Sequence, residues 1–468
     1  MGRVPLKLAS VLTQIIKTAW CTLNPSSKYR RHVVVTSLTS IGLYGVGILT
    51  GPILARSLGP SGRGDIAAVV APASVLALAL TIGLPTAAAY FVDTVAEEQL
   101  LLTAALFGLL LGVPVCALAW FGAPVYLSDH APATITWARW LLLLIPFSVG
   151  TSAAVEIRRR VNPATWNYWR SVPVIVPGLG TIVLAVLGRL TLGSVLALYF
   201  VGQALQLVLL VSRLRERRPW KRPSVATFRL MFPYAWRSST TSTATALTMR
   251  LDQVVLVAAV PPAELGLYAV AVMVASMTNP LTSGLSFALF GHLRGETDES
   301  RALSRFRRSA WTTLLVSSVA ALSLGLLAVP LLRTAFGSDF VEGATALRLL
   351  LPGSVAFDLL GVLNAKLLSD GRPGEASWAA LVGITITVLG LFLVVPHLGV
   401  EGAAIVTSTA FISEVLFLAS RGALGASPGT SNASGTFAIS PMDPSGLGTG
   451  GVTSAREQLD RSDQTDQS

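Results

Sequence analysis

Long apolar segments alternate with short polar ones through most of the 468-residue chain. Twelve of these segments hold roughly twenty mostly apolar residues, the length that a helix needs to cross a hydrocarbon core about 30 Å thick. The pattern therefore predicts an all-α integral membrane protein with about 12 transmembrane helices. The segment at 172–188 is the hardest to delimit, because it is short and holds Pro173 and Pro177. The predicted spans are 33–55, 66–91, 100–121, 135–155, 172–188, 192–212, 233–257, 265–290, 310–332, 346–368, 376–395 and 399–420.

Composition agrees with a membrane protein, and the charge indicates its orientation. Mean hydropathy is +0.64, and only 13% of the residues are charged. A net charge of +11 would suggest a nucleic-acid partner in a soluble protein, but cytoplasmic loops of membrane proteins collect Lys and Arg. Arg139, Arg237 and Arg250 fall inside spans, and most other cations fall on one side when the spans alternate. We therefore expect no nucleic-acid partner, both termini in the cytoplasm and an even number of spans. The cations left on the outer side are Arg56, Arg63, Arg189, Arg333 and Arg348.

The two ends of the chain differ from its middle. Residues 1–32 form a basic arm, whose stretch 4–20 is either a surface amphipathic helix or, as we favour, a positive-inside anchor. No cleavable signal peptide is predicted. The tail at 421–468 is rich in Gly, Ser, Thr, Pro and Asp, so we predict that it is disordered and dispensable for transport. Cys21 and Cys116 are not expected to form a disulfide.

A shift of 202 residues brings two parts of the chain into register. ILARSLGPSGRGDIA then aligns with VLVAAVPPAELGLYA, which pairs Pro60 with Pro262 and Gly64 with Gly266. The same shift superimposes hydroxyl runs that begin at Thr36 and Ser238. This indicates a duplication into bundles 33–212 and 233–420, joined by a basic cytoplasmic linker at 213–232. Six helices per half make the repeats parallel, as in transporters whose halves rock about a central site. The predicted hinge and turn residues are Gly59, Pro60, Gly64 and Gly266.

Polar residues gather in the seventh span. Arg237 precedes an unbroken hydroxyl run at 238–243, which covers every face of a helix, and Arg250 and Asp252 follow. A charge inside the membrane is costly unless it is paired or hydrated. Residues two apart on a helix do not face each other, so Arg250 and Asp252 need other partners. They form either an interhelical ion pair that fixes packing or, as we favour, part of a central cavity.

Two more carboxylates lie inside predicted spans. Asp358 has no basic residue within four positions, and Glu414 is deep in the twelfth span. Either can pair, stay protonated or bind a coupling ion. Arg56 at the outer end of the first span is expected to reach toward the interface, and Glu156 beside three arginines marks a membrane boundary.

Motifs for catalysis are missing from the sequence. The histidines are scattered, so no metal site is predicted, and no phosphate-binding loop, nucleotide fingerprint or Cys cluster is present. We therefore expect no enzyme, no resident cofactor and no ATP hydrolysis within this chain.

Three segments together resemble bacterial polysaccharide exporters, the oligosaccharide flippases of the MATE-like (MOP) superfamily. They are LARSLGPSGRGDIA, RLDQVVLVAAVPPAELGLYAVA and the run from LLPGSVAFDLLGVLNAKLLSDGRPGEASWAA to PHLGVEGAAIVTS. The resemblance covers about 33–420. It implies two six-helix bundles that form a V around a cationic cavity, and a location in the bacterial inner membrane. It also implies transfer of a polyprenyl-diphosphate-linked oligosaccharide to the outer leaflet. This chain departs from the family in showing only Arg237 and Arg250 as basic cavity candidates.

Such a cargo assigns roles to the polar residues. Arginines match phosphate geometry, hydroxyls suit sugars, and the prenyl tail stays in membrane lipid. Asp252, Asp358 and Glu414 are candidates for a coupling proton or Na⁺. Nothing requires a partner chain, and a monomer is plausible. The alternatives are a multidrug/cation antiporter or peptidoglycan-precursor flippase of the same superfamily and, less favoured, a membrane glycosyltransferase, a polymerase or a scaffold. The substrate-binding candidates are Arg237, Arg250, Ser238, Thr241, Thr39 and Ser40.

Overall fold

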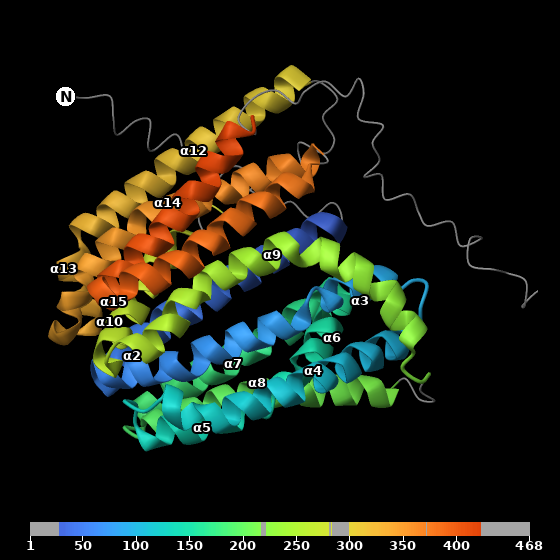
Figure 1. Ribbon diagram of the computed structural model, residues 1–468, viewed down its shortest axis with the longest axis horizontal. Helices are drawn as coiled ribbons and strands as arrows, with labels where there is room; N and C mark the ends of the chain where they lie inside the picture. The colour runs from blue at the N-terminus through green and yellow to red at the C-terminus, as the bar shows by residue number, and fades with distance from the viewer. Residues whose placement is uncertain (1–27, 217–220, 280–281, 283–298, 371, 423–468) are drawn as a thin grey trace, which may run out of the picture. The chain divides into compact units, whose positions relative to one another are not determined.

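The structure, a computed structural model, describes residues 28–216, 221–279, 282, 299–370 and 372–422. These residues belong to one compact unit, and their regular structure is entirely helical (Figure 1). The predicted arm and tail lie outside the described residues, apart from 28–32 and 421–422. The elements of the first half are α2 Lys28–Thr81, α3 Leu84–Phe91, α4 Glu97–Tyr126, α5 Pro132–Leu142, η1 Ile145–Phe147, α6 Ser148–Val161, α7 Pro163–Val186 and α8 Leu192–Glu216. Those of the second half are α9 Val225–Ala259, α10 Pro262–Ala275, η2 Ser276–Thr278, α12 Glu299–Leu326, α13 Ala328–Leu331, η3 Leu332–Phe336, η4 Ser338–Gly343, α14 Ala344–Ser369 and α15 Pro373–Ser420.

Among the described residues, eight helices are long and apolar enough to cross a membrane. This confirms an all-α, multi-pass membrane protein. Two of the eight, Leu38–Thr81 with 44 residues and Gly374–Ser420 with 47, are about twice the length that one crossing needs. The polar α9 and the short α10 are not among the eight, so the number of 12 crossings stays a prediction.

The two longest helices each fold back at a single glycine (Figure 1). In α2 the break is Gly59, with φ 68° and ψ −177°, a conformation essentially restricted to glycine. Pro60 then begins the second arm, where its fixed φ suits a first helical turn. The predicted Gly/Pro turn thus consists of one glycine, and the rest of 56–65, which lies between two predicted spans, is helical. In α15 the break is Gly399, with φ 50°, which is the first residue of the predicted span 399–420.

Several other predicted boundaries also need correction. Helix α7 begins nine residues before the predicted 172–188 and holds both of its prolines. Their bulk is accommodated by Gly202 of α8, where an added Cβ would lie 3.3 Å from Pro173 Cα and 3.2 Å from Pro177 Cδ. Helical structure also covers both ends of the predicted linker, since α8 runs to Glu216 and α9 starts at Val225. The predicted outer loop at 333–345 consists mostly of the helical turns η3 and η4.

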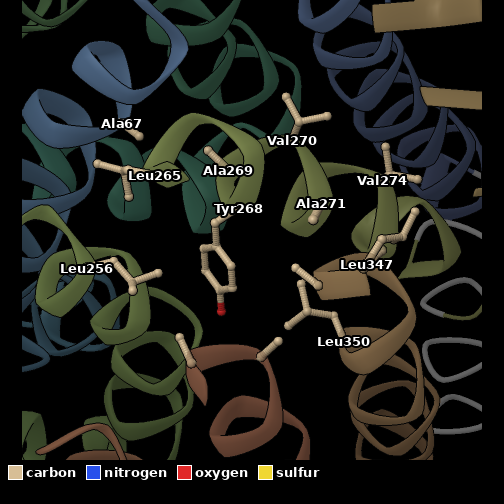
Figure 2. Packing of buried hydrophobic residues seen from close by; sticks show 14 of the residues in the cluster. Ala67, Leu256, Leu265, Tyr268, Ala269, Val270, Ala271, Val274, Leu347 and Leu350 are labelled. Atoms are coloured by element: carbon tan, nitrogen blue, oxygen red, sulfur yellow. The ribbon is translucent and has the colours of Figure 1, made fainter. Parts of the chain in front are cut away.

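The largest apolar core surrounds Tyr268 of α10 (Figure 2). It draws side chains from both halves, because Ala67 of α2 packs with Leu256 of α9 and Leu347 of α14. A second core, around Leu100, Val149 and Ile157, lies mainly within the first half. The two halves are thus joined through the apolar surroundings of α10.

Candidate functional site

Asp252 is buried in the second half and is held entirely by uncharged donors. The Tyr268 hydroxyl of α10 donates to its carboxylate at 2.6 Å, and the Thr407 hydroxyl of α15 donates at 3.2 Å. The backbone N–H of Gln253 donates at 2.6 Å. Asp252 itself is 1% exposed, so its neighbours and not water satisfy it. Helices α9, α10 and α15 therefore converge on one carboxylate in the last third of α9.

Asp358 has a similar environment on α14. The Thr282 hydroxyl donates to one carboxylate oxygen at 2.6 Å, and the Ser317 hydroxyl of α12 donates to the other at 2.5 Å. Asp358 has no basic residue near it in the sequence, and neither of the donors that the structure describes is basic. A carboxylate surrounded by hydroxyls can be retained either ionised or protonated, because a hydroxyl both donates and accepts.

Glu414 of α15 is the least satisfied of the three carboxylates. It is 3% exposed, and its Oε1 has no hydrogen-bond partner among the described residues. It packs against Gly383 in the other arm of α15, where an added Cβ would overlap the carboxyl group. Glycine at 383 thus makes room for a buried acid, a placement that is costly unless the acid is protonated or binds an ion.

The arginines predicted for the site are not gathered around its buried carboxylates. Arg250 is exposed while Asp252 is buried, so the two lie in different environments, as their spacing on α9 requires. Arg237, Ser238 and Thr241 lie outside the residues whose side chains the structure describes. Their proposed contact with substrate stays a prediction.

The hydroxyls of α2 have an arginine partner that the sequence did not indicate. Arg170 of α7 donates to the Ser40 hydroxyl at 2.8 Å and to the Thr36 carbonyl oxygen at 3.3 Å. Its guanidinium also stacks over Trp166, 4.3 Å from the ring centroid. Thr39 instead donates to the Val35 carbonyl oxygen within its own helix at 2.8 Å. The predicted spans place Arg170 in a cytoplasmic loop. Trp166, four residues earlier, is the one signal in the sequence for a helix there.

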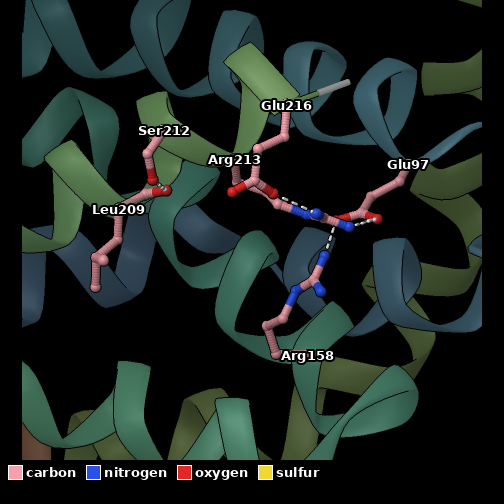
Figure 3. Close-up of polar contacts among 6 residues, drawn as sticks. All are labelled: Glu97, Arg158, Leu209, Ser212, Arg213 and Glu216. Atoms are coloured by element: carbon pink, nitrogen blue, oxygen red, sulfur yellow. Dashed lines mark hydrogen bonds and ion pairs between the residues drawn. The ribbon is translucent and has the colours of Figure 1, made fainter. Parts of the chain in front are cut away.

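The first half also holds a buried ion-pair cluster around Glu97 (Figure 3). Glu97 begins α4 and pairs with Arg158 of α6 and with Arg213 of α8, the latter at 2.9 Å. Arg213 also pairs with Glu216 at 2.6 Å. The sequence predicted a membrane boundary at Glu156 and its neighbouring arginines and a cytoplasmic linker from 213, and the cluster joins Arg158 and Arg213 of these segments to α4. Glu156, the predicted boundary residue, pairs with Arg159 at 2.7 Å.

The predicted turns meet each other across the two halves, and they do so reciprocally. A Cβ added at Gly64 would overlap the carbonyl oxygen of Pro262, and one added at Gly266 would overlap that of Pro60. These four residues are pairs under the 202-residue shift. When residue i of one repeat meets j of the other and j meets i, a local two-fold axis relates the repeats. The contact relates these two short segments only, and the parallel duplication of the two halves stays a prediction.

Further bonds join the halves at the same end of the bundle. The Arg56 guanidinium of α2 donates to the backbone carbonyl oxygens of Thr334 and Ala335 in η3, the latter at 2.9 Å. Tyr126, at the end of α4, donates to the carbonyl oxygen of Val254 in α9. The expectation that Arg56 only reaches toward the interface is wrong, because its side chain binds the opposite half.

Beside this joint lies a buried His–Asp pair. His130, in the segment before α5, is bonded through Nδ1 to Asp65 at 2.7 Å. Asp65 directly follows Gly64, so the pair anchors the second arm of α2 to the segment that precedes α5. The sequence treated both residues as loop positions.

Comparison with known structures identifies the fold. The lipid II flippase MurJ in an inward closed conformation matches with a TM-score of 0.68 and 15% identity, over 83% of this chain and 87% of that one. An inward-facing multidrug resistance MATE family transporter of the MOP superfamily matches with a TM-score of 0.63 and 14% identity, over 81% of this chain and 94% of that one. The predicted MATE-like fold is confirmed.

Sequence comparison identifies the family. The chain is 26% identical to the succinoglycan biosynthesis transport protein ExoT of Rhizobium meliloti (strain 1021), over 76% of this chain and 72% of that protein. This relative is a transport protein, as the sequence predicted for the present chain. The model of the family described as polysaccharide biosynthesis protein matches residues 29–290, more than half of the chain. The protein therefore belongs to the polysaccharide biosynthesis protein family.

Proposed function

We propose that the protein is a flippase that moves a polyprenyl-diphosphate-linked oligosaccharide from the inner to the outer leaflet for surface polysaccharide export. The family match over 29–290 supports a polysaccharide pathway, and the ExoT relative supports transport. The likeness to MurJ supports a fold that accommodates a lipid-linked cargo. The protein then lies in the inner membrane with both termini in the cytoplasm, in agreement with the distribution of Lys and Arg.

One geometric observation carries the mechanism that we propose, the reciprocal contact of Gly64 with Pro262 and of Gly266 with Pro60. Two rigid bodies related by a two-fold axis can rock about it with little change inside either body. We assign the contact to the extracytoplasmic end, so that the described state is closed there. Opening of this joint then releases the head group outside, while the prenyl tail stays in lipid throughout.

The arginines and the carboxylates have different roles: the arginines bind the diphosphate, and the carboxylates bind the coupling ion. A diphosphate needs cationic partners where the dielectric constant is low, and Arg237, Arg250 and Arg170 are the candidates. Arg170 already places its guanidinium among the α2 hydroxyls, which suit the sugar as partners. Asp252, Asp358 and Glu414 take up the coupling proton or Na⁺, because all three are buried acids, and the described hydrogen bonds to Asp252 and Asp358 come from uncharged donors.

The test is a flipping assay with purified protein in liposomes. A fluorescent prenyl-diphosphate sugar is added, and its transfer between leaflets is followed by a quencher that cannot cross the membrane. The wild type is expected to transfer the probe well above protein-free liposomes. Arg250→Ala and Asp252→Ala are expected to abolish the transfer, whereas Arg333→Ala, at an exposed arginine of η3, retains it. Equal rates with and without protein would refute the flippase assignment.

The remaining candidate of the same fold is a multidrug/cation antiporter, and the same liposomes distinguish it. A lipophilic cation replaces the prenyl-diphosphate probe under an imposed proton or Na⁺ gradient. Gradient-driven cation movement without transfer of the prenyl probe would favour the antiporter.

A further inference from the structure

A groove of about 620 Å³ runs between α12 and α14, and nothing above assigns it a role. The positions that α12 contributes include 318, 321, 322 and 325, and those of α14 are 348, 351, 352 and 355. Both sets follow the i, i+3, i+4, i+7 spacing of one helix face. The groove therefore follows two parallel helical stripes for about two turns, or roughly 10 Å.

The groove is apolar along its length. Ala321 and Gly325 contribute almost no side chain, and Leu351 packs next to Gly325, 3.3 Å from where its Cβ would be. Leu322 and Leu326 are 65% and 71% exposed along α12. Helix α12 is one of the candidate membrane spans, so lipid is the medium that meets such a surface.

One end of the groove is polar and positively charged. Arg348 is exposed, and its Nε donates to the Gly325 carbonyl oxygen at 3.1 Å, which fixes the guanidinium beside α12. Its other nitrogens have no hydrogen-bond partner among the described residues. Pro352 has no N–H, so the backbone carbonyl of Arg348, one turn earlier, lacks its usual helical donor. A held cation and a free acceptor thus lie together at the end of an apolar groove.

That end coincides with the joint of the two halves. Helix α12 ends at Leu326, and η3, which Arg56 binds, follows within six residues. At the start of α14, Gly343 lies against Leu267 of α10. The guanidinium is therefore near the level where one leaflet has its head groups.

We propose that this groove binds one anionic phospholipid, with an acyl chain between α12 and α14 and the phosphate on Arg348. Charge complementarity selects this occupant, because guanidinium groups match phosphate oxygens with two parallel donors. The free carbonyl of Arg348 accepts a hydroxyl donor from the head group. The length of the groove fits the upper part of a single chain, and the site is independent of the transport reaction proposed above.

The proposal is tested by native mass spectrometry of protein freed of lipid in detergent. Phosphatidylglycerol and phosphatidylcholine are titrated separately, since only the former combines a net negative charge with hydroxyl donors. The wild type is expected to bind phosphatidylglycerol about tenfold more tightly, which corresponds to about 1.4 kcal/mol. Arg348→Gln is expected to remove the preference, Arg348→Lys to keep most of it, and Arg333→Gln, the matched control, to leave it unchanged. Gly325→Leu fills the groove and should weaken the binding of both lipids.

Each alternative result would overturn the proposal. Equal affinities of the wild type for the two lipids would exclude a head-group site. A preference that survives Arg348→Gln but is lost in Arg333→Gln would place the site elsewhere. A dimer that forms on delipidation and dissociates in Arg348→Gln would identify a second copy of the chain as the occupant. Size-exclusion chromatography verifies that each variant is folded, and the Lys variant keeps the test decisive if the Gln variant misfolds.

Discussion

At the scale of single residues, the buried acids of the second half differ in how they are satisfied. Asp252 accepts three hydrogen bonds and Asp358 accepts two, all from uncharged donors, whereas Glu414 has an oxygen without a partner among the described residues. A buried carboxylate paired to Arg or Lys would be held ionised. Acids among hydroxyls have no such constraint, and for this reason they are better candidates for coupling than the ion-paired Glu97.

Replacement of Asp252 by Asn should therefore separate transport from folding. The amide keeps an acceptor for the Tyr268 hydroxyl but can neither ionise nor release a proton. We expect Asp252→Asn to lower prenyl-diphosphate transfer at least about tenfold, as measured in the liposome assay, with thermal stability close to that of the wild type. Asp339→Asn, at an exposed position of η4, serves as the control. A transport rate for Asp252→Asn equal to that of the control would exclude Asp252 from coupling.

Glu97 should behave in the opposite way. In Glu97→Gln, Arg158 loses its ion-pair partner and Arg213 keeps Glu216, and removal of one member of a buried pair costs about 3 kcal/mol or more. Unfolding of purified protein in detergent measures the difference. Glu98→Gln, the next residue of the same helix, has no ion pair among the described residues and should change stability little. Equal stability of the two variants would show that the cluster of Figure 3 is not structural.

At the scale of elements, close packing between α2 and α10 determines where glycine is required. Gly64 and Gly266 each face a backbone carbonyl of the other helix, and a backbone atom cannot rotate away as a side chain can. Gly47, on the first arm of α2, has open space around it. The same residue type in one helix thus has two different roles, which its sequence context alone does not reveal.

Substitution by alanine should distinguish these two kinds of glycine. Gly64→Ala forces α2 and α10 apart, and overpacking of this kind costs about 1–3 kcal/mol. Gly47→Ala should leave stability unchanged or raise it, because alanine favours helix over glycine. The midpoint of unfolding in detergent measures both variants. If Gly64→Ala unfolded at the same midpoint as Gly47→Ala, the close approach of the two turns would be refuted.

At the scale of the whole molecule, residues of the two halves meet at one end through three kinds of contact. They are the reciprocal Gly/Pro approach, the bonds from Arg56 to η3 and the bond from Tyr126 to α9. The bonds from Arg56 and Tyr126 end on backbone carbonyl groups, so they depend on helix positions and not on a matching side chain. Such contacts can be broken and remade as units when the halves move.

A cross-link at this end should therefore stop transport. In a chain with Cys21 and Cys116 replaced by Ser, cysteines at 56 and 334 are joined by a bifunctional maleimide with a cleavable disulfide spacer. We expect transfer of the prenyl probe to fall to the protein-free rate and to recover on reduction. Singly substituted chains treated with the same reagent should stay active. Full activity of the cross-linked protein would mean that this end does not open during transport.

The sequence by itself determined the membrane-spanning class and the family, while the duplication and the number of spans stay predictions. These follow from hydropathy, charge bias and motifs, which can be read from the sequence without knowing which residues are in contact in the fold. It also located the turn at Gly59, because glycine acts on the backbone at its own position, whereas Gly64, predicted as a turn residue, lies inside the second arm of α2.

Only the tertiary structure decided which side chains meet. Glu97 binds Arg158, which is 61 residues away in the sequence, and Arg213, which is 116 residues away. Arg56 reaches η3 across 279 residues. The spans alone do not state which helix faces which, and a charged residue at a span boundary has the same sequence pattern whether it meets water, lipid or another helix. The physical reason is that burial of a charge depends on its partner, and the partner is chosen by the packing of helices far apart in the chain.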